Sequence, residues 1–270
     1  MEFCSTGQLT LHFDYQKPCG NMVLAFINSL GTDFRIWDAV TTRFRAAGFG
    51  VLRYDKRGHG LSGLGAVPQS IDDHVSDLAG LLDYIGAEEV IAVGLSIGGL
   101  IAQSLYVRRP KAVRALILCD TAHRIGTTRS WNARIDAVNA GGIAAIADDI
   151  LEKWFTPSFH GKRAEELDGY RAMLTRQSPD GYAASCAALR DADHTELVTR
   201  IAVPSLCLVG DQDYSTPPDL VKSMAELIPG ARFEIIKDAG HIPCVEQPDD
   251  VFARIAAFLE TNALGKDRYG

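Results

Sequence analysis

Short and almost uninterrupted apolar runs alternate along this chain with longer segments of helical period. The apolar runs cover residues 9–15, 22–27, 50–54, 90–94, 113–119, 205–209 and 232–236. The helical patterns cover residues 70–85, 98–109, 217–227 and 248–259. Apolar strands without polar alternation are typical of a parallel sheet that is buried on both faces. Their alternation with helices predicts a doubly wound α/β fold.

Residues 121–199 break this alternation, because helical patterns follow one another there without a convincing strand. An all-helical insertion after the run at 113–119, the sixth strand of the fold, accounts for this segment. It would fold over the carboxyl ends of the parallel strands, where open α/β sheets bind their ligands. We therefore expect a core domain of residues 1–120 and 200–270 and a helical cap of residues 121–199.

Residues 94–99 (Gly-Leu-Ser-Ile-Gly-Gly) carry the strongest chemical signal. They follow an apolar run and open a helical pattern, which is the strand–turn–helix context of a G-x-S-x-G nucleophile elbow. In such a strained turn a side chain at Gly94 or Gly98 would clash with neighbouring backbone. The alternative is an ordinary glycine-rich turn, but the context favours Ser96 as a nucleophile.

A serine hydroxyl needs a base at neutral pH, and seven histidines compete for that role. His241 is favoured because it follows the last apolar run and comes after the nucleophile in chain order. His12 and His74 are expected on the surface of a strand and a helix. His59 lies in a turn, where a structural role is expected, and His123 follows a strand and is a lesser candidate for the pocket wall.

The residue that orients the base is expected after the run at 205–209, where Asp211 and Asp213 both qualify. Asp213 is favoured because it lies deeper in the loop, just before the helix that opens at Pro217. Asp211 would instead tie the turn through its side chain. The favoured carboxylate would bind one ring nitrogen of His241, fix its tautomer and stabilise the imidazolium.

An oxyanion hole needs two N–H donors aimed at the charge that develops on the substrate. The amide of Ile97 is one candidate, because it lies at the amino end of the helix that follows the nucleophile. The loop at residues 28–32, after an early strand, offers the second candidate in the amide of Leu30. The alternative for this loop is a plain connection.

Several motifs together resemble the α/β-hydrolase family over nearly the whole chain. Residues 54–62 resemble its Y-D-x-R-G-x-G-x-S stretch, and Asp213 and His241 stand in its acid and base motifs. Residues 28–31 (Asn-Ser-Leu-Gly) occupy the place of its His-Gly-x oxyanion motif. The departure is Asn28 where histidine is common, which leaves the identity of the second oxyanion donor open.

Within that family the chain is most similar to 3-oxoadipate enol-lactonases of the β-ketoadipate pathway. The similar stretches are residues 26–32 in the core and 131–135, 142, 146–148, 154–157, 181–183, 186–188 and 190–191 in the cap. The resemblance implies hydrolysis of 3-oxoadipate enol-lactone to 3-oxoadipate through an acyl-enzyme, in bacterial aromatic catabolism. It calls for no metal and no organic cofactor.

That substrate carries a free carboxylate, so its pocket should hold a cation or several N–H donors. Residues 121–195 contain nine Lys and Arg against ten Asp and Glu, so the cap has no bulk positive field. The similar cap stretches suggest Arg134 or Arg190 as the partner, with Trp131 and Trp154 as an apolar wall. For each arginine the alternative is a surface ion pair.

Composition limits the partners and the cellular location that can be expected for this chain. The formal net charge of -7 argues against nucleic-acid or anionic-membrane partners, which need basic patches. The six cysteines include no C-x-x-C pair, and Cys119 and Cys207 lie in apolar runs, so buried free thiols are expected in a reducing compartment. No signal peptide or transmembrane run is visible, and a cytoplasmic location is expected.

Two rival functions remain open on the sequence alone, and the oligomeric state is open as well. One is another activity on the same scaffold: a carboxylesterase, a carbon–carbon bond hydrolase or a cofactor-free haloperoxidase or perhydrolase. The other is a non-catalytic receptor that kept the fold, against which the intact set of Ser96, Asp213 and His241 argues.

Overall fold

The computed structural model describes residues 2–7, 9–18 and 22–264, and its centre is an eight-stranded sheet. The strands lie in the order β1-β2-β4-β3-β5-β6-β7-β8. Their bounds are β1 (Glu2–Ser5), β2 (Thr10–Gln16), β3 (Met22–Ile27), β4 (Gly50–Tyr54), β5 (Glu89–Leu95), β6 (Val113–Cys119), β7 (Ser205–Gly210) and β8 (Arg232–Ile236). The β1–β2 and β2–β4 pairs are antiparallel and all the others are parallel.

The predicted sheet is confirmed, and its buried strands were the easiest to find. Every residue of β7 is buried, and β3 and β5 each have a single partly exposed residue at the start of the strand. This continuous burial is the reason that apolar runs without alternation marked them. The short edge strand β1 was not predicted, because only Cys4 of its four residues is buried.

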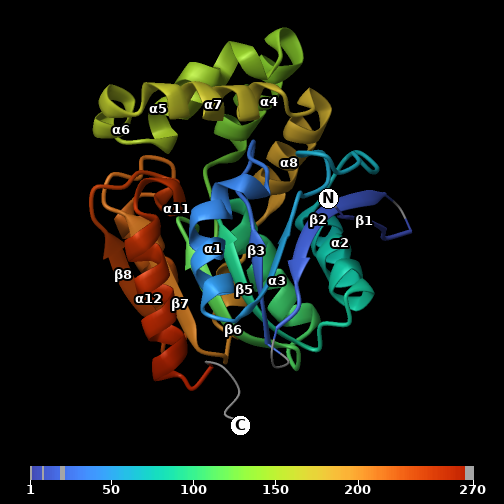
Figure 1. Cartoon of the computed structure of the whole chain (residues 1–270). Helices are drawn as coiled ribbons and strands as arrows, with labels where there is room; N and C mark the ends of the chain where they lie inside the picture. The colour runs from blue at the N-terminus through green and yellow to red at the C-terminus, as the bar shows by residue number, and fades with distance from the viewer. Residues whose placement is uncertain (1, 8, 19–21, 265–270) are drawn as a thin grey trace.

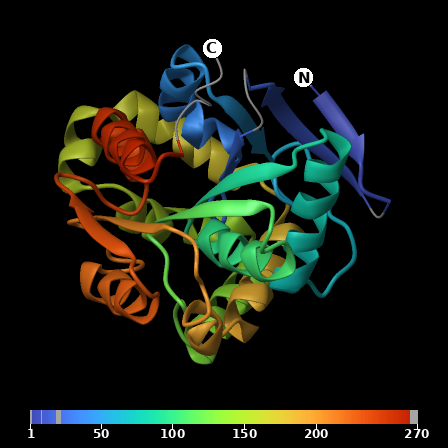
Figure 2. The same cartoon turned by 90° about the horizontal axis from the view of Figure 1, so that it is seen from below.

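Helices cover both faces of the sheet, as Figure 2 shows. Helices α1 and α12 lie on one face, whereas α2, α3 and α10 lie on the other. The bounds of the helices outside the cap are η1 (Phe34–Trp37), α1 (Asp38–Ala46), α2 (Ile71–Tyr84), α3 (Ile97–Arg108), α9 (Thr195–Val198), α10 (Pro218–Leu227), α11 (Pro243–Glu246) and α12 (Pro248–Thr261). Helix α2 begins with a capping box in which Ser70 and Asp73 bond each other's backbone amides.

Between β6 and β7 every described element is helical, and five of these helices with η2 form a layer that we call the cap. Its members are α4 (Thr128–Gly141), η2 (Ile143–Ile146), α5 (Ala147–Trp154), α6 (Pro157–Lys162), α7 (Ala164–Thr175) and α8 (Pro179–Asp191). Figure 1 shows this layer at one end of the sheet, above β3 and β5. The division into domains at residues 120 and 199 stays a prediction.

Two histidines lie elsewhere than predicted. His12 and His74 were expected at the surface, but both are buried. The Nδ1 atom of His12 lies 2.7 Å from a carboxylate oxygen of Asp55, so a tertiary partner explains its burial. His74 lies on the buried face of α2 between Ile71 and Val75, and burial lowers its pKa to about 3, so it is neutral.

The cysteine prediction is confirmed for the described residues: Cys4, Cys119, Cys186, Cys207 and Cys244 are buried free thiols. Cys19 lies outside the described residues. Within the part of the chain that the structure describes, no helix has the length and apolar character needed to cross a bilayer.

Candidate active site

Ser96 lies in the turn between β5 and α3 with a backbone conformation that is rare for a side-chain-bearing residue. Its φ is 57° and its ψ is -119°. A Cβ atom on Gly94 would lie 2.2 Å from the Gly98 carbonyl oxygen, and one on Gly98 would lie 2.4 Å from that of Ile27. Both contacts are impossible, so glycine at these two positions is what lets the strained turn pack against β3.

The strain at Ser96 is held in place by hydrogen bonds on both sides. Its amide donates to the Cys119 carbonyl at 3.0 Å, and its own carbonyl accepts from the Thr121 hydroxyl at 2.6 Å and the Gly99 amide at 2.8 Å. The end of β6 therefore fixes the turn at the end of β5.

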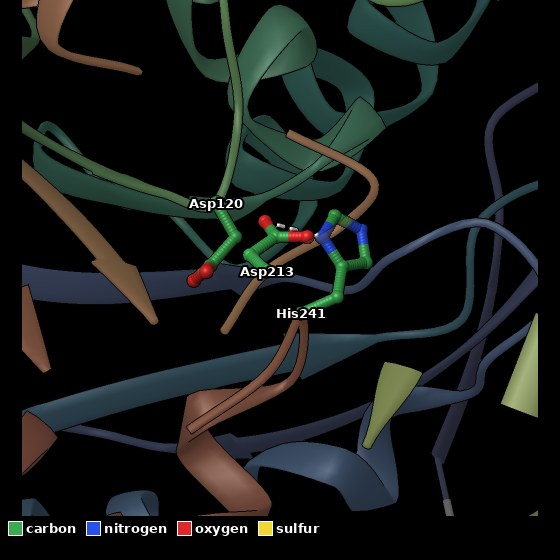
Figure 3. Close-up of side chains that lie close together, drawn as sticks. All are labelled: Asp120, Asp213 and His241. Carbon is green, nitrogen blue, oxygen red and sulfur yellow. Dashed lines mark hydrogen bonds and ion pairs between the residues drawn. The ribbon is translucent and has the colours of Figure 1, made fainter. Parts of the chain in front are cut away.

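His241 and Asp213 come from the loops after β8 and β7 and meet directly, as Figure 3 shows. The imidazole Nδ1 lies 2.9 Å from Asp213 Oδ2, and both side chains are buried. Burial alone would raise the pKa of the Asp213 carboxyl, but His241 and the donors of Thr216 together lower it below its ordinary value. The carboxylate is thus ionised and commits Nδ1 to carry a proton, which leaves Nε2 as the basic ring nitrogen.

Both oxygens of Asp213 are fully engaged. Oδ1 accepts from the amides of Ser215 and Thr216 at 2.7 and 3.1 Å, and Oδ2 accepts from the Thr216 hydroxyl at 2.6 Å and from His241. The competing candidate, Asp211, instead accepts from the Ala239 amide at 3.2 Å. It ties two loops together and does not contact the histidine.

A second buried carboxyl, Asp120, lies behind this pair and was not predicted. It follows β6 with a φ of 44°, and one of its oxygens accepts from the Gly210 amide at 2.9 Å. One oxygen from each of Asp120 and Asp213 and a ring nitrogen of His241 lie within 4.8 Å of one another. Burial, and then the charge of Asp213, raise the pKa of Asp120 well above its usual range, which favours the neutral acid. A neutral acid beside a fully hydrogen-bonded carboxylate is a poor set of metal ligands.

Glu246 connects the loop of His241 to the cap. Its Oε2 accepts from the Gly240 amide at 2.7 Å, while Oε1 accepts from the amide and the hydroxyl of Thr156 at 3.1 and 2.7 Å. A Cβ atom on Gly240 would lie 2.7 Å from the Trp154 carbonyl, so only glycine allows this approach. The base loop and the end of α5 are therefore held together by one carboxylate.

The loop after β3 contains both paired and unpaired backbone amides among the described residues. The Gly31 amide donates to Nε2 of His59 at 3.0 Å, and the Thr32 amide donates to the Ser29 carbonyl at 3.3 Å. Among the described residues, neither the Leu30 amide nor the Ile97 amide at the start of α3 has an acceptor. These are the two donors that the sequence predicts for an oxyanion hole, and Leu30 lines the same cavity as Ser96.

Ser96, His241 and Leu30 line one cavity of about 190 Å³ beneath the cap. Three of the predicted substrate contacts line it as well: Trp131 and Arg134 on α4 and Trp154 on α5. Lys153, Tyr182 and Tyr214 also line it and were missed: the first two lie on cap helices, and Tyr214 follows Asp213 in the loop after β7. His123 is not among the lining residues.

Arg190 is the predicted contact that the structure does not bring to the cavity. Its guanidinium lies 2.8 Å from each carboxylate oxygen of Asp191 and 3.0 Å from the amide oxygen of Asn132, all on the exposed side of the cap. A surface ion pair therefore accounts for Arg190, as the alternative to a substrate contact predicts.

Arg134 differs from Arg190 in its surroundings. Its guanidinium carbon lies 5.1 Å from the centre of the Trp131 ring, a cation–π contact within the cavity wall. Among the described residues no carboxylate forms an ion pair with it. Together with Lys153 it gives this small cavity two cationic side chains and no acidic one.

Comparison with known proteins identifies the family of this chain. A model of the alpha/beta hydrolase family matches residues 25–255. "3-Oxoadipate enol-lactonase 2" of Acinetobacter baylyi is 35% identical over 83% of this chain and 84% of its own length, and "3-oxoadipate enol-lactonase 1" of that species is 30% identical over 93% and 94%. The crystal structure of the enol-lactonase from Burkholderia xenovorans superposes with a TM-score of 0.92 at 31% identity, covering 96% of this chain and 100% of that one. The chain therefore belongs to the α/β-hydrolase family.

Proposed function

We propose that this hydrolase is a serine esterase that opens 3-oxoadipate enol-lactone to 3-oxoadipate in the β-ketoadipate pathway of aromatic catabolism. The observation that carries the proposal is the bond between His241 Nδ1 and Asp213, 2.9 Å long, in a pair that reaches the cavity of Ser96. The similarity to two enol-lactonases along most of the chain supports the choice of substrate.

In the proposed reaction, Ser96 Oγ attacks the lactone carbonyl while Nε2 of His241 takes its proton. The amides of Leu30 and Ile97 stabilise the negative charge on the carbonyl oxygen. The ring C–O bond then breaks, and the ring oxygen leaves as an enolate that becomes the ketone. Water, activated by His241, attacks the acyl-enzyme and releases the second carboxylate of the product.

The free carboxylate of the lactone would bind Arg134, which lines the cavity and has no acidic partner among the described residues. A charge-assisted hydrogen bond contributes about 1.5–3 kcal/mol, so its loss should weaken binding about tenfold to a hundredfold. Trp131 and Trp154 would cover the apolar part of the ring.

The direct test is a lactonase assay with the purified protein and its Ser96→Ala variant, using the enol-lactone beside 4-nitrophenyl acetate. We expect the wild-type protein to open the lactone and Ser96→Ala to lose nearly all of this activity. Labelling by a fluorophosphonate probe should disappear in the same variant. Full activity in Ser96→Ala would refute the nucleophile, and turnover of the acetate without the lactone would refute the substrate.

The carboxylate site has its own test in Arg134→Ala. We expect KM for the anionic lactone to rise at least tenfold while KM for 4-nitrophenyl acetate stays within twofold. Arg129→Ala is the matched control, because Arg129 is exposed on the same helix α4 and does not line the cavity. Equal changes for both substrates would contradict the role of Arg134.

A further inference from the structure

Lys56, the second residue after β4, is fully buried and lies under the loop that carries the Leu30 amide. Its Nζ donates a hydrogen bond of 2.8 Å to the Ser29 carbonyl oxygen. The same oxygen accepts from the hydroxyl of Thr32 at 2.9 Å and from its amide at 3.3 Å. One peptide oxygen therefore receives three donors, of which one is an ammonium group.

No carboxylate forms an ion pair with Lys56 among the described residues. The negative charges of Asp55 and Asp33 act on it electrostatically, but each carboxylate pairs with another group: Asp55 with His12 at 2.7 Å, and Asp33 with Arg35 at 2.6 Å. The ammonium group is thus directed at a neutral peptide oxygen.

The contact of Lys56 with the Ser29 carbonyl affects the Leu30 amide, because the two groups belong to the same peptide. A trans peptide is planar, with its C=O and N–H bonds pointing in opposite directions. Fixing the oxygen on the side of Lys56 therefore fixes the direction of the N–H on the other side, where Leu30 lines the cavity of Ser96. A positive charge at the oxygen end also polarises the peptide and makes its N–H a stronger donor.

We propose that Lys56 is a positioning residue of the oxyanion hole, which orients and polarises the Ser29–Leu30 peptide so that the Leu30 amide stabilises the tetrahedral intermediate. The inference rests on the proposed function, because it requires Leu30 to be an oxyanion donor.

The cost of burying its ammonium group favours a functional role for Lys56 over simple packing. Burying an ammonium group without an ion-pair partner is unfavourable, because the group loses its hydration. A methionine would fill the same space beneath the loop without that cost. The ammonium charge of Lys56 becomes favourable when a negative charge develops near the Leu30 N–H, at the other end of the peptide group that it contacts.

The main test is Lys56→Met, measured with a phenyl trifluoromethyl ketone and with 4-nitrophenyl acetate. The ketone forms a hemiketal: the Ser96 Oγ–C bond forms, the hydroxyl proton passes to His241, and the carbonyl electron pair becomes the oxyanion. Removing an oxyanion donor outright costs about 10²–10³ in kcat. Since Lys56 acts through a donor that remains, we expect Ki and kcat to worsen about tenfold to a hundredfold while KM stays within twofold.

Thr32→Val is the matched control, because it removes a neutral donor from the same oxygen and keeps the charge. We expect its Ki to change less than threefold. A loss as large as that of Lys56→Met would overturn the role of the charge. Thermal unfolding of both variants shows whether they are folded, and Lys56→Met should unfold within a few degrees of the wild-type protein.

The pH dependence of inhibition supplies a second test, in which the wild-type protein is compared with Lys56→Met. Burial lowers the pKa of Lys56 to about 7, against the opposing effect of Asp55 and Asp33. The other titratable groups that face it, His59 and His74, have pKa values lowered by burial and stay neutral. The ammonium charge is present below about pH 7 and lost above it. The contribution of Lys56 to inhibition should therefore be lost, and Ki for the ketone should rise, as pH rises through this range.

Lys56→Met should lack this component of the pH dependence, so the ratio of the two Ki values at each pH isolates it. Identical pH profiles, or a Ki that is unchanged in Lys56→Met, would overturn the proposal. A parallel rise of KM and Ki with a lowered unfolding temperature would also overturn it, in favour of a purely structural lysine. If the protein hydrolyses 4-nitrophenyl acetate but not the enol-lactone, the proposed substrate is refuted. The role of Lys56 is then still tested with the acetate and the ketone. A wild-type protein that neither cleaves the acetate nor binds the ketone refutes both.

Discussion

Replacing Asp213 by asparagine should remove the basicity of His241 without disturbing the packing around it. The structure decides which way the new amide points. Its oxygen must take the place of Oδ1, because the amides of Ser215 and Thr216 both donate there. The NH₂ group therefore takes the place of Oδ2 and donates to Nδ1 of His241, which then has to be the unprotonated nitrogen.

The histidine is thereby locked in the wrong tautomer, with its proton on Nε2, where it can no longer accept the proton of Ser96. The same change in Ser-His-Asp proteases leaves the geometry intact and lowers kcat about 10⁴-fold. At about 1.36 kcal/mol for each factor of ten, this is a loss of about 5.4 kcal/mol of transition-state stabilisation. We expect a similar loss here, with KM nearly unchanged.

Steady-state hydrolysis of 4-nitrophenyl acetate measures this effect, because kcat and KM are obtained separately. Asp211→Asn is the matched control: its carbonyl oxygen can still accept from the Ala239 amide, so activity should stay within about twofold. A normal kcat in Asp213→Asn, or a large loss in Asp211→Asn alone, would refute the reasoning and transfer the acid role to the other aspartate.

Three further predictions concern stability as well as activity. Gly98→Ala should lower kcat at least tenfold in the acetate assay, since its Cβ would meet the Ile27 carbonyl at 2.4 Å and separate α3 from β3; normal kcat with an intact fold would contradict this. Glu246→Ala should lower the free energy of unfolding in urea by about 2 kcal/mol, because buried donors lose their acceptor. The exposed control Glu226→Ala should change it by no more than about 0.5 kcal/mol. Equal changes in the two variants would show that Glu246 does not hold the cap to the loop of His241. The lowered pKa of Asp213 contributes stability above the ordinary aspartate pKa, and this contribution is lost as pH falls through the folded-state value. The stability advantage of the wild-type protein over Asp213→Asn should therefore shrink as pH falls below about 5; a constant difference would oppose this assignment.

The core of the fold could be predicted from the sequence because its signals are local. Residues 22–27 and 113–119 were predicted with the bounds that the structure has, since each is a continuous apolar run. The glycines around Ser96 are likewise a local signal, because a side chain at either position would clash with neighbouring backbone. Loop residues such as His241 could be placed because a parallel sheet collects its carboxyl ends at one edge.

The features that could not be predicted from the sequence depend mostly on contacts between distant parts of the chain. The burial of His12 follows from Asp55, which lies 43 positions away, and no local pattern announces it. His74 is different, because its spacing from Ile71 and Leu78 already places it on the apolar face of the helix. Asp120 and Lys153 could not be found, because one needs the neighbouring strand and the other needs the folded cap.

The order of the strands has a consequence for how the protein acquires its activity during synthesis. The strand that leads to Ser96 lies in the middle of the sheet, but the strands that present Asp213 and His241 are made only after the whole cap. If Ser96 is the nucleophile and His241 its base, as proposed, a nascent chain contains the serine long before it contains the base, because more than a hundred residues separate them. A chain that ends before β8 would then lack the proposed base, and ester hydrolysis would depend on completion of the sheet.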